Sequence, residues 1–297
     1  MKTLTVFTPT YNRGYILHNC YEALLRQTSN DFKWLIIDDG STDNTETIVK
    51  QWIEENRIDI QYIKQENQGM HGAHNTAHKN ADTLLTVCCD SDDFFSDRAV
   101  EIIINLWKEK SSDKHAGIIG HDADLNGNRL VEIPSYLKET TLYDLRYKLK
   151  LRGDFKLIYR TDLLQEETYP LIKGEKYLAV GYKYFLLDQK YSLIVTNETL
   201  CFVDYQNDGG TINKTKKYVE SPKGFMHYRI KMMPIMHNYF QKYWQAIHYI
   251  NSAIFAKDSN FIQKSPCKIT TILAIPFGFV LNQYIRYKYR NKYLQKD

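Results

Sequence analysis

The stretch Leu84-Leu85-Thr86-Val87-Cys88-Cys89-Asp90-Ser91-Asp92-Asp93 runs from six mostly apolar residues straight into three acids. Residues 84–89 have the length and composition of a buried strand in a parallel sheet. Three neighbouring carboxyl groups repel one another, so their arrangement is costly unless a cation binds there. A divalent metal bound to a phosphate-bearing ligand would be such a cation. Alternatively, the acids cap the following helix, because Asp and Ser are common at helix N-termini.

Composition narrows the class of protein. The chain has 297 residues, of which 43% are hydrophobic, and a formal net charge of +4. This length allows a domain with a full core plus an appended segment, and the small net charge is not typical of a protein that binds nucleic acid. Five scattered cysteines without a Cys-x-x-Cys pair favour a reducing cytoplasm over a disulfide framework or a zinc site. The first residues enter an apolar strand at once, so we expect no signal peptide.

Strand-like and helix-like segments alternate over the first 120 residues. We predict helices over 15–27, 45–55, 71–81 and 99–107, between strands at 4–8, 34–37, 60–63, 84–89 and 116–120. This alternation predicts an α/β fold whose mostly parallel sheet carries helices on both faces. Ligands of such sheets bind beyond the carboxyl ends of the strands. Polar clusters follow the predicted strands and should meet at that edge, namely 9–13, 38–43, 66–71 and 90–93.

The first two polar clusters carry groups that suit a nucleotide. Tyr11 can stack on a base and Arg13 can bind a phosphate, although an ordinary loop would also have this composition. The acids of segment 38–41 can accept hydrogen bonds from a base or a ribose, or can belong to the cap of the next helix. No G-x-G-x-x-G follows the first strand and no G-x-x-x-x-G-K-[ST] occurs, which excludes the Rossmann dinucleotide and P-loop motifs.

Three histidines share one face of the predicted helix 71–81. His71, His74 and His78 have the spacing i, i+3 and i+7. This spacing raises the hypothesis of a zinc site. We do not favour it, because no glutamate general base accompanies the histidines as it does in His-Glu-x-x-His.

Four segments resemble the motifs of family 2 glycosyltransferases with the GT-A fold. They occur in the family's order, each at a predicted strand end, and comprise residues 6–13, 35–43, 67–75 and 90–93. The third is most similar to a subgroup with Gly-x-His-x-Ala-x-Asn, matched here by Gly69, His71, Ala73 and Asn75. The resemblance is firm to about residue 120, patchy to about residue 215 and absent beyond. It implies a Rossmann-like mixed sheet with helices on both faces.

The resemblance also implies the reaction and the donor site. The family transfers a sugar from a nucleotide-diphosphate donor, usually a UDP-sugar, to an acceptor hydroxyl with inversion. The residues at motif positions that would bind this donor are Thr8, Pro9, Tyr11, Arg13, Asp39, Gly69, His71, Asn75, Asp90 and Ser91. Asp92, with Asp90 as a second candidate, would ligate Mn²⁺ or Mg²⁺, which offsets the charge on the departing diphosphate.

An inverting transfer needs a general base for the acceptor hydroxyl. The segment Gly174-Glu175-Lys176-Tyr177 resembles the subgroup's Gly-Glu-Lys-aromatic stretch, so the resemblance points to Glu175 as the base. Alternatively, Glu175 is a solvated side chain between two lysines. The subgroup often has a second acid five residues later, where this chain has Val180, and Asp188 is the reserve candidate.

We expect a GT-A catalytic domain over 1–215, with a nucleotide-sugar half at 1–120 and an acceptor half at 121–215, followed by a helical extension at 216–297. Asn126-Gly127 predicts a tight turn. Segment 191–205 resembles a strand and segment 207–211 a turn. Segment 222–257 is helical, aromatic and rich in methionine, which favours helices that pack on the catalytic domain.

The last residues of the chain combine apolar, basic and tyrosine side chains. Segment 269–281 is nearly all apolar, but thirteen residues are too few to cross about 30 Å of hydrocarbon. Basic residues and tyrosines alternate over 284–293, which favours an interfacial helix on an anionic membrane. We therefore expect peripheral contact through 266–297 with the inner face of the cell membrane, and a lipid-linked acceptor in envelope or capsular polysaccharide synthesis. A buried C-terminal helix or a homo-oligomer interface is the alternative.

Two other classes of function are weaker hypotheses. A nucleotidyltransferase that makes nucleotide sugars would open with a glycine-rich, arginine-containing loop, and residues 8–14 contain a single glycine. A non-catalytic protein that binds a nucleotide sugar for another transferase is supported only by Val180 in place of the second acid.

Overall fold

The computed structural model describes residues 2–205 and 214–294. The chain forms two compact units. The first comprises Met1–Thr168 and Leu187–Gln206, and the second comprises Tyr169–Leu186 and Asn207–Asp297. This division differs from the expected boundary after residue 215, because the segment that contains Glu175 groups with the C-terminal helices.

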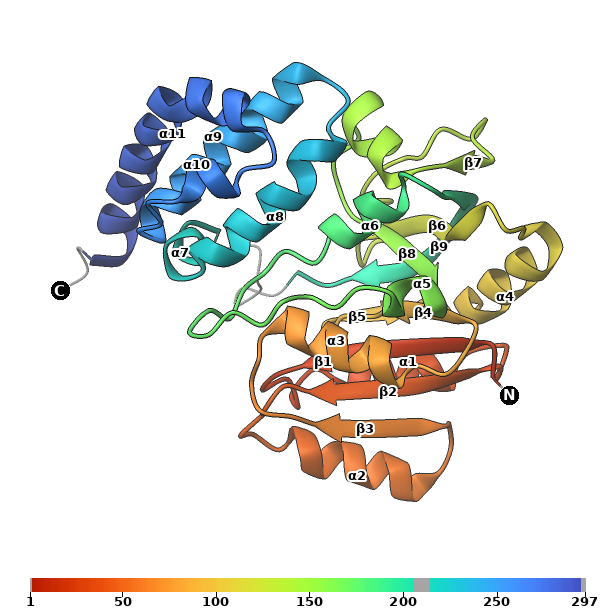
Figure 1. The fold of residues 1–297 in the computed structure, drawn as a ribbon. Helices are drawn as coiled ribbons and strands as arrows, with labels where there is room; N and C mark the ends of the chain where they lie inside the picture. The colour runs from red at the N-terminus through yellow and green to blue at the C-terminus, as the bar shows by residue number, and fades with distance from the viewer. Residues whose placement is uncertain (1, 206–213, 295–297) are drawn as a thin grey trace. The chain divides into compact units, whose positions relative to one another are not determined.

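A mixed sheet is the framework of the first unit (Figure 1). Its described strands are β1 Leu4–Thr10, β2 Phe32–Asp38, β3 Ile60–Lys64, β4 Leu85–Cys88, β5 Asp93–Phe95, β6 His115–Ala123, β7 Glu139–Thr140, β8 Phe155–Arg160 and β9 Ser192–Val203. The strand order is β3-β2-β1-β4-β8-β6-β9-β5, with β7 paired to β9. The strands β3, β2, β1 and β4 are parallel, whereas β8 is antiparallel to both β4 and β6. The four polar loops therefore leave the sheet at one edge.

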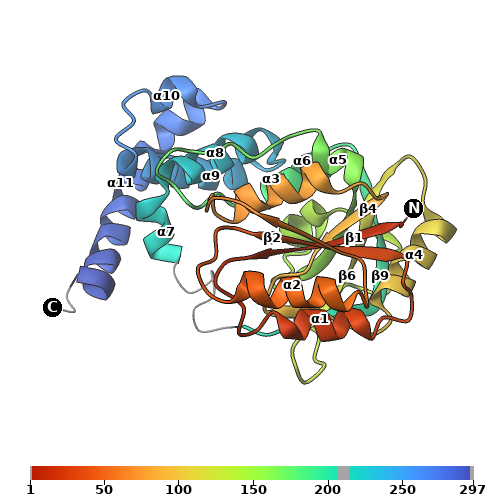
Figure 2. The ribbon, with the colours of Figure 1, turned by 90° about the horizontal axis from the view of Figure 1, so that it is seen from below.

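Helices cover both faces of this sheet, as predicted (Figure 2). The helices of the first unit are α1 His18–Leu25, α2 Thr45–Glu55, α3 Met70–Asn80, α4 Ala99–Lys110, α5 Thr161–Gln165 and the π-helix η1 Asp144–Lys148. Successive residues of a strand face opposite sides of the sheet. Trp34 and Ile36 of β2 therefore pack with α1 and α2, whereas Leu35 and Ile37 pack with α3.

The described part of the second unit is mainly helical. Its helices are α7 Lys214–Glu220, α8 Pro222–Ile235, α9 Tyr239–Phe255, α10 Phe261–Lys264, α11 Lys268–Tyr289 and η2 Arg290–Leu294, and α6 Tyr182–Leu187 ends at the boundary of the first unit. The helix α9 contacts both α8 and α11. A Cβ atom on Gly278 would lie 2.5 Å from Ile250 Cγ2, so only glycine allows α11 to approach α9 this closely.

The sequence-based elements of the first 120 residues are present with small changes of boundary. The structure adds β5, which begins at Asp93. Helix α4 begins only at Ala99, so the interpretation of the acids 90–93 as its cap is wrong. Gly127 has a φ of 84° in a turn closed by an antiparallel bridge between Ala123 and Arg129, which confirms the predicted turn. The turn predicted over 207–211 lies outside the described residues.

The C-terminal apolar segment belongs to a longer helix than expected. Helix α11 has 22 residues and continues through Pro276. At 1.5 Å per residue it is about 33 Å long. The expectation that this segment is too short to cross a bilayer is therefore wrong for the helix as a whole. By length and composition, Lys268–Tyr293 could cross a membrane.

Candidate active site

The loops that follow β1 and β2 are held together by Asn12. Its side-chain oxygen accepts a hydrogen bond from Thr42 N at 2.8 Å, and its backbone N donates to Ser41 Oγ at 2.9 Å. Asn12 adopts a left-handed φ of 53°, which Asn tolerates better than most residues. The strand ends Thr10 and Asp38 are paired directly across the sheet. The first two predicted motifs are thus one connected surface.

Asp39 connects the second motif to the third. Its carboxylate accepts hydrogen bonds from Gln68 N and Gly69 N, each at 2.8 Å, and from Gln65 Nε2 at 2.7 Å. Gly69 has a φ of 80° and directly precedes α3, a backbone conformation that favours glycine. The carboxylate of Asp39 therefore fixes the loop from which α3 begins.

The predicted donor residues differ in their accessibility. Tyr11 is 50% exposed at this edge. Residues that are partly exposed, and so can contact a ligand, are Pro9, Arg13, Gly69, Asn75 and Asp90. Ser91 is buried but belongs to the same turn as Asp90.

Two further predicted donor residues, Thr8 and His71, are buried. Thr8 has no exposed surface, and its hydroxyl accepts a hydrogen bond from Trp34 Nε1 at 2.9 Å. His71 is only 2% exposed. Both side chains are enclosed by the protein, and their contact with the donor stays a prediction.

The other two histidines of α3 are also core residues. The rings of His74 and His78 meet the edge of the Phe7 ring, with centroids 4.9 and 5.6 Å away. In the described part of the chain, no group of three or more His, Cys, Asp or Glu residues is arranged to hold a metal ion. The zinc hypothesis for this helix therefore has no structural support.

The acids after β4 surround a buried lysine that sequence analysis missed. Lys156 of β8 has its Nζ 3.8 Å from Asp93 Oδ2 and 3.7 Å from Asp122 Oδ1 of β6, and it donates to Cys88 O at 3.4 Å. All three charged side chains are buried. The sequence signal that could have indicated this buried charge is a lysine within the largely apolar run that forms β8.

The charged residues form two sets. Lys156, Asp93 and Asp122 are buried, whereas Asp90 and Asp92 are partly exposed. Burial disfavours the charged form of Lys156, but the charges of Asp122 and Asp93 outweigh this effect and raise its pKa. Burial raises the pKa of Asp122 to about 6, despite the opposing charge of Lys156. Burial and then repulsion from Asp90 raise the pKa of Asp92, while Arg13 lowers it. Lys156 therefore compensates the buried acids, and the repulsion between Asp90 and Asp92 remains.

The pair Asp90 and Asp92 fits a divalent cation. Both are partly exposed carboxylates at a strand end, and Mg²⁺ or Mn²⁺ prefers such oxygen ligands. Mg²⁺ typically binds to one or two carboxylates and completes its coordination with waters and substrate phosphates. Two carboxylates, whose mutual repulsion a cation would relieve, are thus a sufficient donor set.

Both candidate general bases form backbone hydrogen bonds at helix starts. In the second unit, the Glu175 carboxylate accepts from Lys223 N at 3.0 Å and from Gly224 N at 2.8 Å, the first turn of α8. In the first unit, Asp188 accepts from Tyr143 N at 2.7 Å, next to η1. Burial raises the pKa of Asp188 to about 7.

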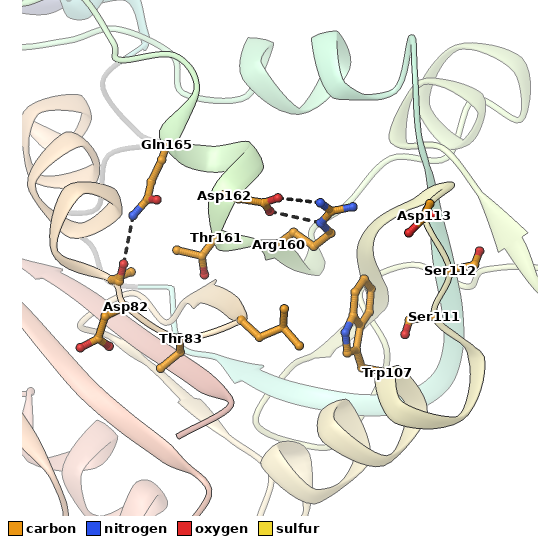
Figure 3. A pocket seen from close by; sticks show the side chains of 12 residues that line it. Asp82, Thr83, Trp107, Ser111, Ser112, Asp113, Arg160, Thr161, Asp162 and Gln165 are labelled. Carbon is orange, nitrogen blue, oxygen red and sulfur yellow. Dashed lines mark hydrogen bonds and ion pairs between the residues drawn. The ribbon is translucent and has the colours of Figure 1, made fainter. Parts of the chain in front are cut away.

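A cleft of about 620 Å³ lies at the opposite edge of the sheet (Figure 3). It lies before β4 and beyond the end of β8, where Arg160 pairs with Asp162 at 2.6 Å. Its lining residues are Ala81, Asp82, Thr83, Leu84, Trp107, Ser111, Ser112, Asp113, Arg160, Thr161, Asp162 and Gln165. No predicted site residue lines this cleft, so it is separate from the four-loop edge.

The sheet order and the four loops at one edge of the sheet are those of a GT-A fold. The chain belongs to glycosyl transferase family 2, because the model of that family matches residues 5–167, more than half of the chain. The match includes all four loops and Lys156.

Curated relatives include several bacterial glycosyltransferases. The chain is 34% identical over 124 residues to the poly(ribitol-phosphate) beta-N-acetylglucosaminyltransferase TarP of Staphylococcus aureus, which covers 40% of this chain and 37% of TarP. It is 26% identical over 231 residues to the glycosyltransferase GlyG of Streptococcus pneumoniae, covering 72% and 73% of the two chains. A match to the glycosyltransferase GlyA of the same species spans 35% of that protein. The chain thus spans little more than a third of TarP and GlyA.

Solved structures share the fold at low sequence identity. Staphylococcus aureus TarS 1–349 in complex with UDP-GlcNAc aligns with a TM-score of 0.63 and 18% identity, covering 98% of this chain and 92% of that one. A mannosyltransferase of Pyrobaculum calidifontis in complex with GDP-Man and Mn²⁺ aligns with a TM-score of 0.57 and 15% identity, covering 95% and 87%. These similarities confirm the predicted GT-A fold.

Proposed function

We propose that this protein is an inverting, metal-dependent glycosyltransferase of the hexosyltransferase type, which moves a sugar from a UDP-sugar to an acceptor hydroxyl. The observation that carries the proposal is the meeting of four loops at the carboxyl edge of β1 to β4, around Asp90 and Asp92. Family membership and the shared fold with a UDP-GlcNAc complex of TarS support it.

The donor would lie across the connected loops. Tyr11 is exposed enough to stack on the base, and Asp39, although only 5% exposed, would accept a hydrogen bond from it. Arg13 would contact the diphosphate, because a guanidinium matches phosphate oxygens. The Asp90–Ser91 turn would bind the ribose or the sugar. The start of α3, with Gly69 and Asn75 and the backbone N–H groups of its first turn, would complete the site.

Asp92, together with Asp90, would hold Mn²⁺ or Mg²⁺. When bound, the ion supplies Lewis-acid stabilisation of the charge on the diphosphate. The protein would hold the ion in place and balance the charge of the neighbouring acids. Lys156 compensates Asp93 and Asp122, so that the metal has only the exposed pair of acids to neutralise.

Glu175 is our proposed general base for the acceptor hydroxyl. Each of its carboxylate oxygens accepts one backbone hydrogen bond and keeps a second lone pair, so that it can still accept a proton. Asp188 is the reserve, because a pKa of about 7 suits proton transfer at neutral pH.

We further propose that the acceptor is a lipid-linked glycan in cell-envelope or capsular polysaccharide synthesis. The protein would then work in the cytoplasm, peripheral on the inner face of the cell membrane. An exposed apolar side of α11, flanked by basic residues, supports this location.

A second candidate is a non-catalytic partner that binds a nucleotide sugar for another transferase. The observation in its favour is that both candidate bases are engaged at helix starts, and that Val180 stands where the subgroup has an acid.

Donor turnover separates the two candidates. The transferase should be stabilised against heat by UDP with Mn²⁺, and should release UDP slowly from a UDP-sugar even without acceptor. A binding partner would show the same thermal shift but no UDP release. Absence of any shift across a panel of nucleoside diphosphates and nucleotide sugars would overturn both.

A further inference from the structure

Helix α11 buries mostly small and polar residues and exposes most of its large apolar ones. Its buried residues are Thr270, Thr271, Ala274, Gly278, Asn282 and Ile285. The inward side is held by polar contacts, since Asn282 Nδ2 donates to Asn251 Oδ1 of α9 at 3.2 Å and Thr271 shares a hydrogen bond with Ser265 at 2.7 Å. A helix of a water-soluble unit normally buries its apolar side.

The outward side forms a continuous apolar stripe. We define the α11 outer face by its exposed large apolar residues, which recur at helical spacing, namely Ile269, Ile272, Leu273, Phe277, Phe279, Val280, Tyr284 and Tyr287. Ile269 is 76% exposed and Val280 is 65% exposed. Of the exposed residues between Ile269 and Tyr284, only Gln283 is polar. Contiguous apolar surface of this kind marks a binding surface.

The charges around this face identify its partner. Lys264 is paired with Asp258 at 2.5 Å, and residues 265–296 contain six further Lys or Arg and no Asp or Glu. A second copy of the chain would bring two such basic segments together without acids to pair them. An anionic lipid surface is attracted by these charges and accepts the apolar side chains beneath its headgroups.

The positions of the basic residues also indicate how α11 would be oriented relative to a membrane. Lys268 stands at the start of α11, and Arg286 and Lys288 lie in its last turn. A helix that crosses the bilayer would place these basic ends on opposite sides, whereas basic residues favour the cytoplasmic side. In addition, α9 packs against the inner side of α11. A one-sided apolar surface suits a helix that lies along the interface.

We propose that the α11 outer face binds the surface of an anionic lipid bilayer, with the helix parallel to the membrane plane. This inference extends the proposed function, because a transferase bound in this way is placed beside a lipid-linked acceptor. The binding itself requires neither donor nor acceptor.

Co-sedimentation of the full chain with vesicles tests the proposal. Vesicles of 30% phosphatidylglycerol in phosphatidylcholine should pellet the protein, and pure phosphatidylcholine should pellet it at least about fivefold less, since each basic residue near an anionic surface contributes about a fivefold change. Ile269→Ser/Val280→Ser should weaken binding at least about tenfold, because each buried CH₂ contributes to partitioning. Lys288→Gln/Arg290→Gln should abolish the preference for the anionic lipid.

A matched control is Leu125→Ser/Tyr136→Ser, which removes two exposed apolar residues of the first unit. It should bind like wild type. Equal binding by the control and by Ile269→Ser/Val280→Ser would overturn the proposal. So would a dimer in lipid-free light scattering that Ile269→Ser/Val280→Ser converts to a monomer, because the face would then be a self-interface. UDP release by the same variants is measured separately, so that failure of vesicle binding is distinguishable from failure of the transferase proposal.

Discussion

Lys156 Nζ lies 3.7 Å from Asp122 Oδ1, and both groups are buried beside the Asp90–Asp93 turn. Lys156→Met should leave the Asp122 carboxylate without a counter-charge, since burial raises the pKa of Asp122 only to about 6 but that of Asp93 to about 8. Removing one partner of a buried ion pair typically costs about 3–5 kcal/mol. We expect a loss of this size in the free energy of unfolding, measured in urea at pH 7.5. Lys156→Met/Asp122→Asn should recover part of it, and a loss below about 1 kcal/mol in Lys156→Met would show that the contact is not a compensating pair.

Asp92→Asn should remove a metal ligand while keeping the shape of the turn. We expect turnover to fall at least about 10²-fold, the scale of removing one charge-stabilising group. The Mn²⁺-dependent part of the thermal shift with UDP should disappear as well. Asp113→Asn is the control, because it neutralises an exposed acid at the opposite edge of the sheet. Full activity of Asp92→Asn, or of wild type in EDTA, would contradict a metal role.

Glu175→Gln separates two roles of one side chain. The amide replaces one carboxylate oxygen, so a backbone N–H at the start of α8 loses its acceptor, which should cost about 1 kcal/mol. If Glu175 is also the base, kcat should fall about 10²–10⁴-fold. We expect both changes. A lower melting temperature with wild-type kcat would assign Glu175 to the helix cap alone.

Tyr11→Ala should weaken donor binding specifically. Stacking of a base on an aromatic ring contributes about 1–3 kcal/mol. The Kd for UDP should therefore rise at least about fivefold, as measured by calorimetry with Mn²⁺ present. Tyr136→Ala removes another exposed tyrosine and should leave the Kd unchanged. Equal affinities of the two variants would exclude Tyr11 from the base site.

The raised pKa of Asp188 predicts how the free energy of unfolding depends on pH. Its folded-state pKa of about 7 is higher than the value of about 3.9 in an unfolded chain. Between these values the folded state binds more protons, so stability from this group falls as pH rises from about 4 to about 7. Asp188→Asn removes this dependence and keeps an oxygen for Tyr143 N. The variant should gain roughly 1–4 kcal/mol relative to wild type between pH 5 and pH 8 in urea unfolding. Parallel profiles of the two proteins would contradict the shift.

The edge with the four polar loops could be predicted because its information is local. Each strand from β1 to β4 is a short run, and the polar residues that follow it in sequence also follow it in space. Asp92 and Tyr11 were therefore placed at this edge from the sequence alone. The burial of Thr8 and His71 depends on neighbours from other elements, Trp34 among them, which a local pattern does not show.

The rest of the site depends on contacts between distant segments. Strand β8 lies between β4 and β6, and this insertion brings Lys156 to Asp93 and Asp122. Glu175 meets the start of α8 across 48 residues of sequence. The length of α11 was underestimated because the apolar run ends at Leu281, whereas the helix continues through polar and basic residues to Tyr289.

The insertion of β8 between β4 and β6 limits how this protein can be divided. A fragment that stops after residue 120 would retain all four polar loops but lose the strand that pairs with both β4 and β6. Two apolar strands would then expose open edges, which favours aggregation. Residues 1–120 are therefore not an autonomous module, and domain exchange between relatives would have to carry at least residues 1–168 as one piece.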